Sequence, residues 1–119
     1  AAEQKIRPVL SHGDLRVENV IVAEVGRINA IIDWEGCLSD TPAWDLSIAL
    51  HDLGIDGTQH FLEGYGISER KLRDALPLIK AFNIANYASA LEGMAAEGSR
   101  ERLAQYRLRL SGALDLYSI

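Results

Sequence analysis

A dense group of polar side chains lies between His12 and Asp33. Asp14 and Asn19 flank a turn of four residues, and Asp33 follows the apolar run Ile28 to Ile32. Mg2+ prefers oxygen ligands, and one or two protein side chains usually hold it together with waters and substrate phosphates. Asn19 and Asp33 offer such oxygens, while Asp14 can accept or orient a hydroxyl proton for in-line attack on a phosphoryl group. These residue types at this spacing indicate metal-assisted phosphoryl transfer.

A β-hairpin is needed to bring these residues together. The β-branched runs Val20 to Val25 and Ile28 to Ile32 are separated by a short turn, which predicts two antiparallel strands. A hairpin that begins at Asn19 and ends at Asp33 returns the chain to its starting point. We therefore expect these two side chains to be neighbours. A further short apolar run, Pro8 to Ser11, precedes the group.

Helices are expected in the rest of the chain. Gly36 to Asp40 is interpreted as a polar loop, after which Thr41-Pro42 supplies an N-cap and a proline at the first helical position. The apolar spacing predicts helices over Ala43 to Leu53, over Thr58 to Tyr65, from Ser68 to Gly98, and over Ser99 to Tyr117. Gly54 and Gly57 should end the first of these helices, and Gly66 the second.

The segment from Ser68 to Gly98 contains a proline that should interrupt it. Pro77 lacks an N–H donor and its ring clashes with the preceding turn, so we expect a break there. Beyond the break, apolar residues at helical spacing form a face that should be largely buried: Leu78, Ile79, Phe82, Ile84, Ala85, Tyr87, Ala88 and Leu91. The last segment is predicted to be amphipathic, with its apolar residues three or four apart: Leu103, Tyr106, Leu110, Leu114 and Tyr117.

The composition fits one folded domain or part of one. Of the 119 residues, 48% are hydrophobic and 24% are charged, which is enough apolar material for a core. Acidic residues outnumber basic ones by 17 to 12, which argues against a nucleic-acid partner because such binding depends on clustered Lys and Arg. No apolar run is long enough to predict a membrane span, and a single cysteine is typical of the reducing cytoplasm. The start lacks Met and a signal pattern, as if the chain had been cut.

Three motifs stand in a characteristic order: H-G-D-x-x-x-x-N at His12 to Asn19, I-D-W-E at Ile32 to Glu35, and P-A-W-D-L at Pro42 to Leu46. Together they resemble the aminoglycoside phosphotransferase and choline-kinase-like family, which has a protein-kinase-like fold. The segment Phe61 to Gly66 is also similar to the C-terminal lobe of that family. The resemblance implies an α+β fold over residues 1–119, a kinase-like C-terminal lobe that is mostly helical and carries its metal site on an N-terminal β-hairpin.

The resemblance also implies an ATP-dependent enzyme that transfers the γ-phosphoryl group to a small-molecule hydroxyl with the help of Mg2+. Asp14 would be the catalytic base, and Asn19 and Asp33 would hold the magnesium ions that bridge the ATP phosphates. His12 and Asp45 would support the catalytic loop without touching substrate. The resemblance therefore assigns five residues to one site.

Some features leave alternatives open. Glu35 is either an acid close to the metal or a solvated loop residue. Gly13 stands where eukaryotic protein kinases have arginine, which favours a small-molecule acceptor by analogy. The adjacent pair His51-Asp52 is also found in metal phosphohydrolases of the HD type, although their sites are built entirely from helices. A binding or scaffold module derived from a kinase lobe is the other alternative.

The nucleotide-binding elements of the family have no counterpart in this sequence. The phosphate loop, the strand lysine and its glutamate partner would precede Ala1, and Lys5, Lys71 and Lys80 lack a strand context. We therefore expect the nucleotide-binding lobe to be absent, the chain to be inactive alone, and the surface left by the missing lobe to promote self-association. The expected partners are a nucleotide and a small-molecule acceptor, which is an aminoglycoside, another antibiotic, a choline-like amine, or a sugar or amino-acid alcohol.

Overall fold

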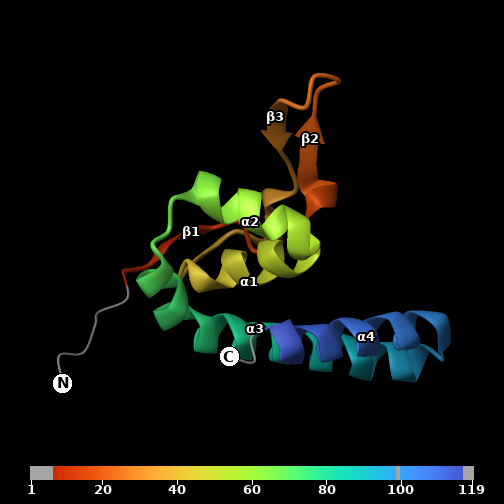
Figure 1. Ribbon diagram of the computed structural model, residues 1–119. Helices are drawn as coiled ribbons and strands as arrows, with labels where there is room; N and C mark the ends of the chain where they lie inside the picture. Colours follow the sequence, from red (N-terminus) through yellow and green to blue (C-terminus); the bar gives the residue numbers. More distant parts are fainter. Residues whose placement is uncertain (1–6, 99, 117–119) are drawn as a thin grey trace. The chain divides into compact units, whose positions relative to one another are not determined.

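The computed structural model describes residues 7–98 and 100–116 of the chain. It is mostly helical with short strands near the beginning, so the predicted α+β class is confirmed (Figure 1). The chain divides into two compact units, an N-terminal unit up to Gly66 and a C-terminal unit from Ile67. Every candidate site residue lies in the N-terminal unit.

Two small antiparallel sheets form the first part of the N-terminal unit. Strands β2 (Val20–Val22) and β3 (Ile28–Ile31) are the predicted hairpin, somewhat shorter than the apolar runs suggest. Strand β1 (Val9–Ser11) pairs with β4 (Leu38–Asp40). The segment from His12 to Asn19 therefore connects the β1–β4 sheet to the β2–β3 sheet.

The prediction of a polar loop from Gly36 to Asp40 is wrong. Trp34–Gly36 form a short 3-10 helix, η2, and the residues that follow it are strand β4. Strand β4 has only three residues, too few to show a period, and its partner β1 lies far away in the sequence. Local patterns do not contain this pairing, which comes from a distant part of the chain.

Helices α1 (Ala43–Asp52) and α2 (Gly54–Tyr65) complete the N-terminal unit. Helix α1 begins where predicted, but its N-cap residue is Pro42 and not Thr41; Oγ1 of Thr41 still accepts the N–H of Ala43 at 3.3 Å. The buried apolar residues of α1 are Ala43, Leu46, Ala49 and Leu50. Helix α1 therefore contributes four residues to the core of the N-terminal unit.

Helix α1 ends at Asp52, close to the predicted end at Leu53, but the prediction that Gly54 and Gly57 separate it from a second helix at Thr58 is wrong, because α2 begins at Gly54 and contains Gly57. A Cβ at Gly57 would lie 3.1 Å from the Cβ of Leu53, so this glycine allows the two helices to follow each other closely. Gly66 ends α2 as predicted, with φ at 72° and its N–H bonded to the carbonyl of Leu62 at 3.0 Å.

The C-terminal unit is a pair of helices, α3 (Glu69–Glu97) and α4 (Arg100–Leu116), which lie side by side (Figure 1). The prediction of a break at Pro77 is wrong, since α3 continues through this residue. The proline is exposed and removes one N–H donor, a loss that a helix of 29 residues tolerates. Gly98 ends α3 as predicted, whereas the ends predicted at Ser99 and Tyr117 lie outside the described residues.

Helix α3 is also less buried than predicted. Of the eight apolar residues expected on its buried face, Ile79 alone is buried, while Ala85 and Ala88 are exposed. Its other buried residues are Asn83 and Met94. The sequence pattern shows which residues are apolar, but α3 has one packing partner in its own unit, and this partner buries only some of them. No helix within the described ranges is long and apolar enough to cross a membrane.

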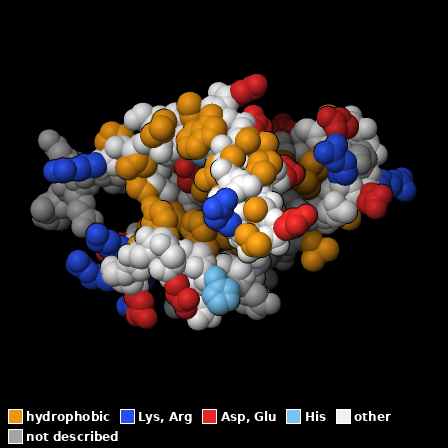
Figure 2. All heavy atoms as spheres, turned by 90° about the horizontal axis from the view of Figure 1, so that it is seen from above, with side chains coloured by type: hydrophobic (Ala, Val, Ile, Leu, Met, Phe, Trp, Pro, Cys, Tyr) orange, Lys and Arg blue, Asp and Glu red, His pale blue; other side chains and the backbone are white. Residues whose placement is uncertain are grey.

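The β2–β3 hairpin exposes apolar side chains. Val25 in its turn is 87% exposed and Ile28 is 62% exposed. Figure 2 shows hydrophobic side chains gathered on the face seen from above. Contiguous apolar surface of this kind is typical of surfaces that meet a ligand or another protein. The self-association expected from the sequence stays a prediction.

Candidate functional site

The candidate catalytic loop is anchored to the beginning of α1. The Asp45 carboxylate accepts the backbone N–H of His12 through Oδ2 at 2.7 Å and that of Gly13 through Oδ1 at 3.0 Å. The indole Nε1 of Trp44 donates to the carbonyl of Gly13 at 3.0 Å. Hydrogen bonds to a charged acceptor are among the stronger ones in proteins, so this end of the loop is held firmly.

His12 connects the loop to the strand that leads into Asp33. The imidazole is 2% exposed, and its Nε2 lies 2.8 Å from the carbonyl of Ile32. A carbonyl can only accept, so Nε2 carries the proton. Nδ1 then accepts the backbone N–H of Asp14 at 3.2 Å. One side chain thus links the position of Asp14 to that of the segment before Asp33.

Asp14 and Asn19 are in direct contact. Nδ2 of Asn19 donates to the backbone carbonyl of Asp14 at 2.8 Å and lies 3.4 Å from the side-chain oxygen Oδ2 of Asp14. The other carboxylate oxygen, Oδ1, accepts from Nε of Arg16 at 2.7 Å. The side chain of Asp14 is 41% exposed, so the carboxylate is oriented by the loop and still open to a ligand.

Asp33 directly follows the residue that pairs with Asn19, and it has an unusual backbone conformation. The N–H of Ile32 donates to the carbonyl of Asn19 at 2.9 Å, which brings the two ends of the hairpin together as predicted. Asp33 has φ at 64° and ψ at 56°, the left-handed region, and it alone adopts positive φ among the described non-glycine residues. Such strain concentrates at functional positions, where the rest of the structure maintains it.

The available oxygens fit a magnesium ion. Asn19 uses its amide nitrogen to bind Asp14, so its Oδ1 is left without a hydrogen bond from the described residues. The carboxylate of Asp33 is exposed and has no hydrogen bond to any described residue. An amide oxygen and a carboxylate suit Mg2+ when phosphate oxygens and waters complete the coordination. The described residues contain no group of three or more His, Cys, Asp and Glu side chains that could hold a metal by themselves.

The other candidate residues differ in their placement. Glu35 lies in η2, is exposed, and forms no hydrogen bond or ion pair with the other described site residues. Asp52, considered from the sequence as part of an HD-type pair, instead accepts the backbone N–H of Val17 at 2.7 Å. This contact was missed, although a signal for it exists. Asp45 and Asp52 are seven positions apart, about two helical turns, and therefore lie on one side of α1.

Gly13 makes a close approach that no other residue type permits. It has φ at 91°, and a Cβ there would lie 2.3 Å from the carbonyl oxygen of Gly36. The catalytic loop and the segment after Asp33 therefore touch through their backbones. The H-G-D motif favours a small-molecule acceptor through Gly13, but it does not predict this packing role, which depends on Gly36 far along the chain.

We expect two substitutions at Asp33 to separate its backbone strain from its carboxylate. Asp33→Gly should be more stable than Asp33→Ala by about 1 kcal/mol, because glycine adopts positive φ without steric cost. Both variants should lose the same carboxylate and hence bind Mn2+ equally weakly. Urea unfolding and a Mn2+ titration of the two variants check this, and equal stability would contradict the strained backbone.

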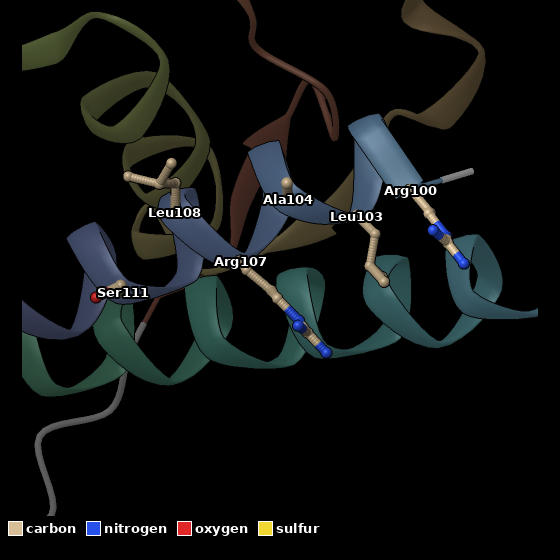
Figure 3. A pocket seen from close by; sticks show the side chains of 6 residues that line it. All are labelled: Arg100, Leu103, Ala104, Arg107, Leu108 and Ser111. Atoms are coloured by element: carbon tan, nitrogen blue, oxygen red, sulfur yellow. The ribbon is translucent and has the colours of Figure 1, made fainter. Parts of the chain in front are cut away.

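A hollow of about 550 Å3 lies along α4, away from these residues in sequence. Its lining residues are Arg100, Leu103, Ala104, Arg107, Leu108 and Ser111. Figure 3 shows that all six belong to the one helix. None of them is a candidate site residue.

A comparison with protein-family models matches residues 1–79 to the phosphotransferase enzyme family, labelled APH. The matched range contains the catalytic loop, the hairpin, and the whole of α1. Searches of curated proteins and of solved structures gave no match. The family match confirms the resemblance carried by the three motifs, and the chain belongs to the phosphotransferase enzyme family.

Proposed function

We propose that this chain carries the catalytic and metal-binding residues of an ATP-dependent phosphotransferase that acts on a small-molecule hydroxyl. The observation that supports this most is the contact of Asn19 with Asp14 at the point where the hairpin brings Asp33 back. A hydroxyl-orienting carboxylate and two oxygen ligands are the minimum set for phosphoryl transfer, which depends mostly on positioning and charge neutralisation.

In this proposal Asp14 orients the acceptor hydroxyl and takes its proton as the hydroxyl oxygen bonds to the γ-phosphorus of ATP. The bond from that phosphorus to the oxygen bridging it to the β-phosphate breaks, and ADP leaves. Arg16 holds Oδ1 of Asp14 at 2.7 Å, whereas Oδ2 has only the longer contact of 3.4 Å with Asn19 and can also accept from the hydroxyl. Asn19 and Asp33 would hold Mg2+, which when bound neutralises charge on the ATP phosphates. His12 and Asp45 act on the loop backbone and do not touch substrate.

We further propose that the chain is the C-terminal lobe of its enzyme. The adenine- and phosphate-clasping elements would then come from a segment outside the 119 residues. The exposed apolar surface of β2 and β3 is consistent with a need for cover on that side. ATP and Mg2+ are the proposed cofactors, and the acceptor is a small molecule with a free hydroxyl.

The metal site can be tested on the chain itself with Mn2+, a paramagnetic substitute for Mg2+. In the 15N-labelled protein, Mn2+ should broaden the resonances of Asn19 and Asp33 first, because both contribute an oxygen ligand. Asp33→Ala should remove this selectivity. Glu24→Ala, which removes an exposed carboxylate from the hairpin turn, should leave it unchanged. Broadening spread evenly over the surface carboxylates would contradict the site and favour the scaffold alternative.

Catalysis is tested on the natural protein that contains this chain. We expect transfer of label from γ-labelled ATP to an acceptor in a panel of aminoglycosides, choline-like amines and sugar alcohols, and only with a divalent metal present. Transfer to water alone would indicate a nucleotide hydrolase. Absence of transfer to every acceptor, with intact nucleotide binding, would contradict a phosphotransferase acting on these substrates.

A further inference from the structure

We propose that Asp52 is a positioning residue for the catalytic loop, acting through the backbone N–H of Val17. This inference rests on the proposed function for its importance, but it concerns a contact that the motifs do not include. Its carboxylate oxygen Oδ2 lies 2.7 Å from the nitrogen of Val17, a short charge-assisted hydrogen bond.

The bond meets a need of the loop. Val17–Asn19 form the short 3-10 helix η1, and Arg16, at its N-cap, makes no side-chain capping bond. The first N–H groups of a helix have no partner within it, and a capping side chain normally supplies one. Asp52 supplies this acceptor from α1, about two turns after Asp45 on the same side of that helix.

The consequence is that α1 holds the loop on both sides of Asp14. On the N-terminal side of Asp14, Asp45 accepts the N–H groups of His12 and Gly13. On the C-terminal side, Asp52 accepts the N–H of Val17. The η1 turn ends at Asn19, whose amide binds Asp14. Fixing the start of η1 therefore fixes the direction from which Asn19 reaches Asp14.

Exchange and chemical-shift measurements on the 15N-labelled chain test this role. Asp52→Ala should raise the hydrogen-exchange rate of the Val17 amide about tenfold or more, because a bond to a charged acceptor is lost. It should also move the side-chain amide resonances of Asn19 toward those of a free asparagine. Asp52→Asn should restore both signals, because the amide oxygen can still accept from Val17. Glu18→Gln removes a neighbouring exposed carboxylate and should change neither.

Three results would overturn the proposal. The first is an unchanged exchange rate of the Val17 amide in Asp52→Ala. The second is a faster exchange of Val17 while the Asn19 side-chain resonances stay in place. The third is an equal rise in the exchange rates of the β1–β4 amides. The last would mean that Asp52→Ala lowers the stability of the whole N-terminal unit and has no specific effect on the loop. Mn2+ added to the same samples tests the proposed function separately. Absence of broadening at Asn19 in the unaltered chain would contradict the metal site, whereas the role of Asp52 is decided by the exchange rates.

Discussion

Asp14→Asn should lower the rate of phosphoryl transfer about a thousandfold in the natural protein that contains this chain. The amide keeps the shape of the side chain and can still contact Asn19, but it cannot take the proton of the acceptor hydroxyl. The affinity for magnesium-bound nucleotide should change little, because the proposed ligands are Asn19 and Asp33. Initial rates at saturating ATP, together with the KM for ATP, measure the two effects.

The loss of the ion pair between Asp14 and Arg16 does not account for such a change. Both side chains are about two-fifths exposed, at 41% and 39%, and an exposed pair contributes about 1 kcal/mol or less. Glu18→Gln, which removes a carboxylate from the same loop, is the matched control and should keep its activity. Turnover by Asp14→Asn within a few-fold of the unaltered enzyme would rule out Asp14 as the base.

Gly13→Ala should destabilise the N-terminal unit by about 2 kcal/mol or more and abolish the organised loop. The added Cβ would lie 2.3 Å from the carbonyl oxygen of Gly36, and φ at this position is 91°. The backbone of Gly13 cannot move away freely, because Asp45 accepts its N–H and Trp44 donates to its carbonyl. Urea unfolding measures the loss in free energy.

Gly26→Ala provides the matched control for that experiment. Gly26 also has positive φ, at 79°, but nothing lies within 4 Å of the place where its Cβ would stand. Its substitution should therefore show the backbone cost alone, about 1 kcal/mol. A loss at Gly13 no larger than that at Gly26 would contradict the close contact with Gly36.

Local patterns in the sequence account for much of the fold. The β-branched runs predicted the hairpin, Thr41 predicted the start of α1, and Gly66 and Gly98 predicted the ends of α2 and α3. Each of these features depends on residues close together in the chain. The proximity of Asn19 and Asp33 followed from the hairpin in the same way.

The failures have two physical causes. Strand β4 and the hydrogen bond that Val17 donates to Asp52 depend on partners far away in the sequence. The spacing of Asp45 and Asp52 places both carboxylates on one side of α1, but it does not identify the N–H groups that they accept. At Gly57 and Pro77 the residue type was weighed as a helix stop, yet a glycine within a helix costs only about 1 kcal/mol and a proline can be tolerated on an exposed side. The catalytic and metal-binding roles of Asp14, Asn19 and Asp33 stay predictions until the experiments above are made.

The anchoring of the loop by α1 also affects the order in which the site forms during protein synthesis. Asp45 lies 33 and 32 positions after the two residues whose N–H groups it binds, and Asp52 lies 35 positions after Val17. Because the ribosome releases the chain from its N-terminus, the whole catalytic loop emerges before either anchor. The nascent loop therefore lacks its hydrogen bonds to Asp45 and Asp52 until α1 has left the exit tunnel and folded. A synonymous change that slowed translation between these segments would lengthen that exposed interval without altering the finished protein.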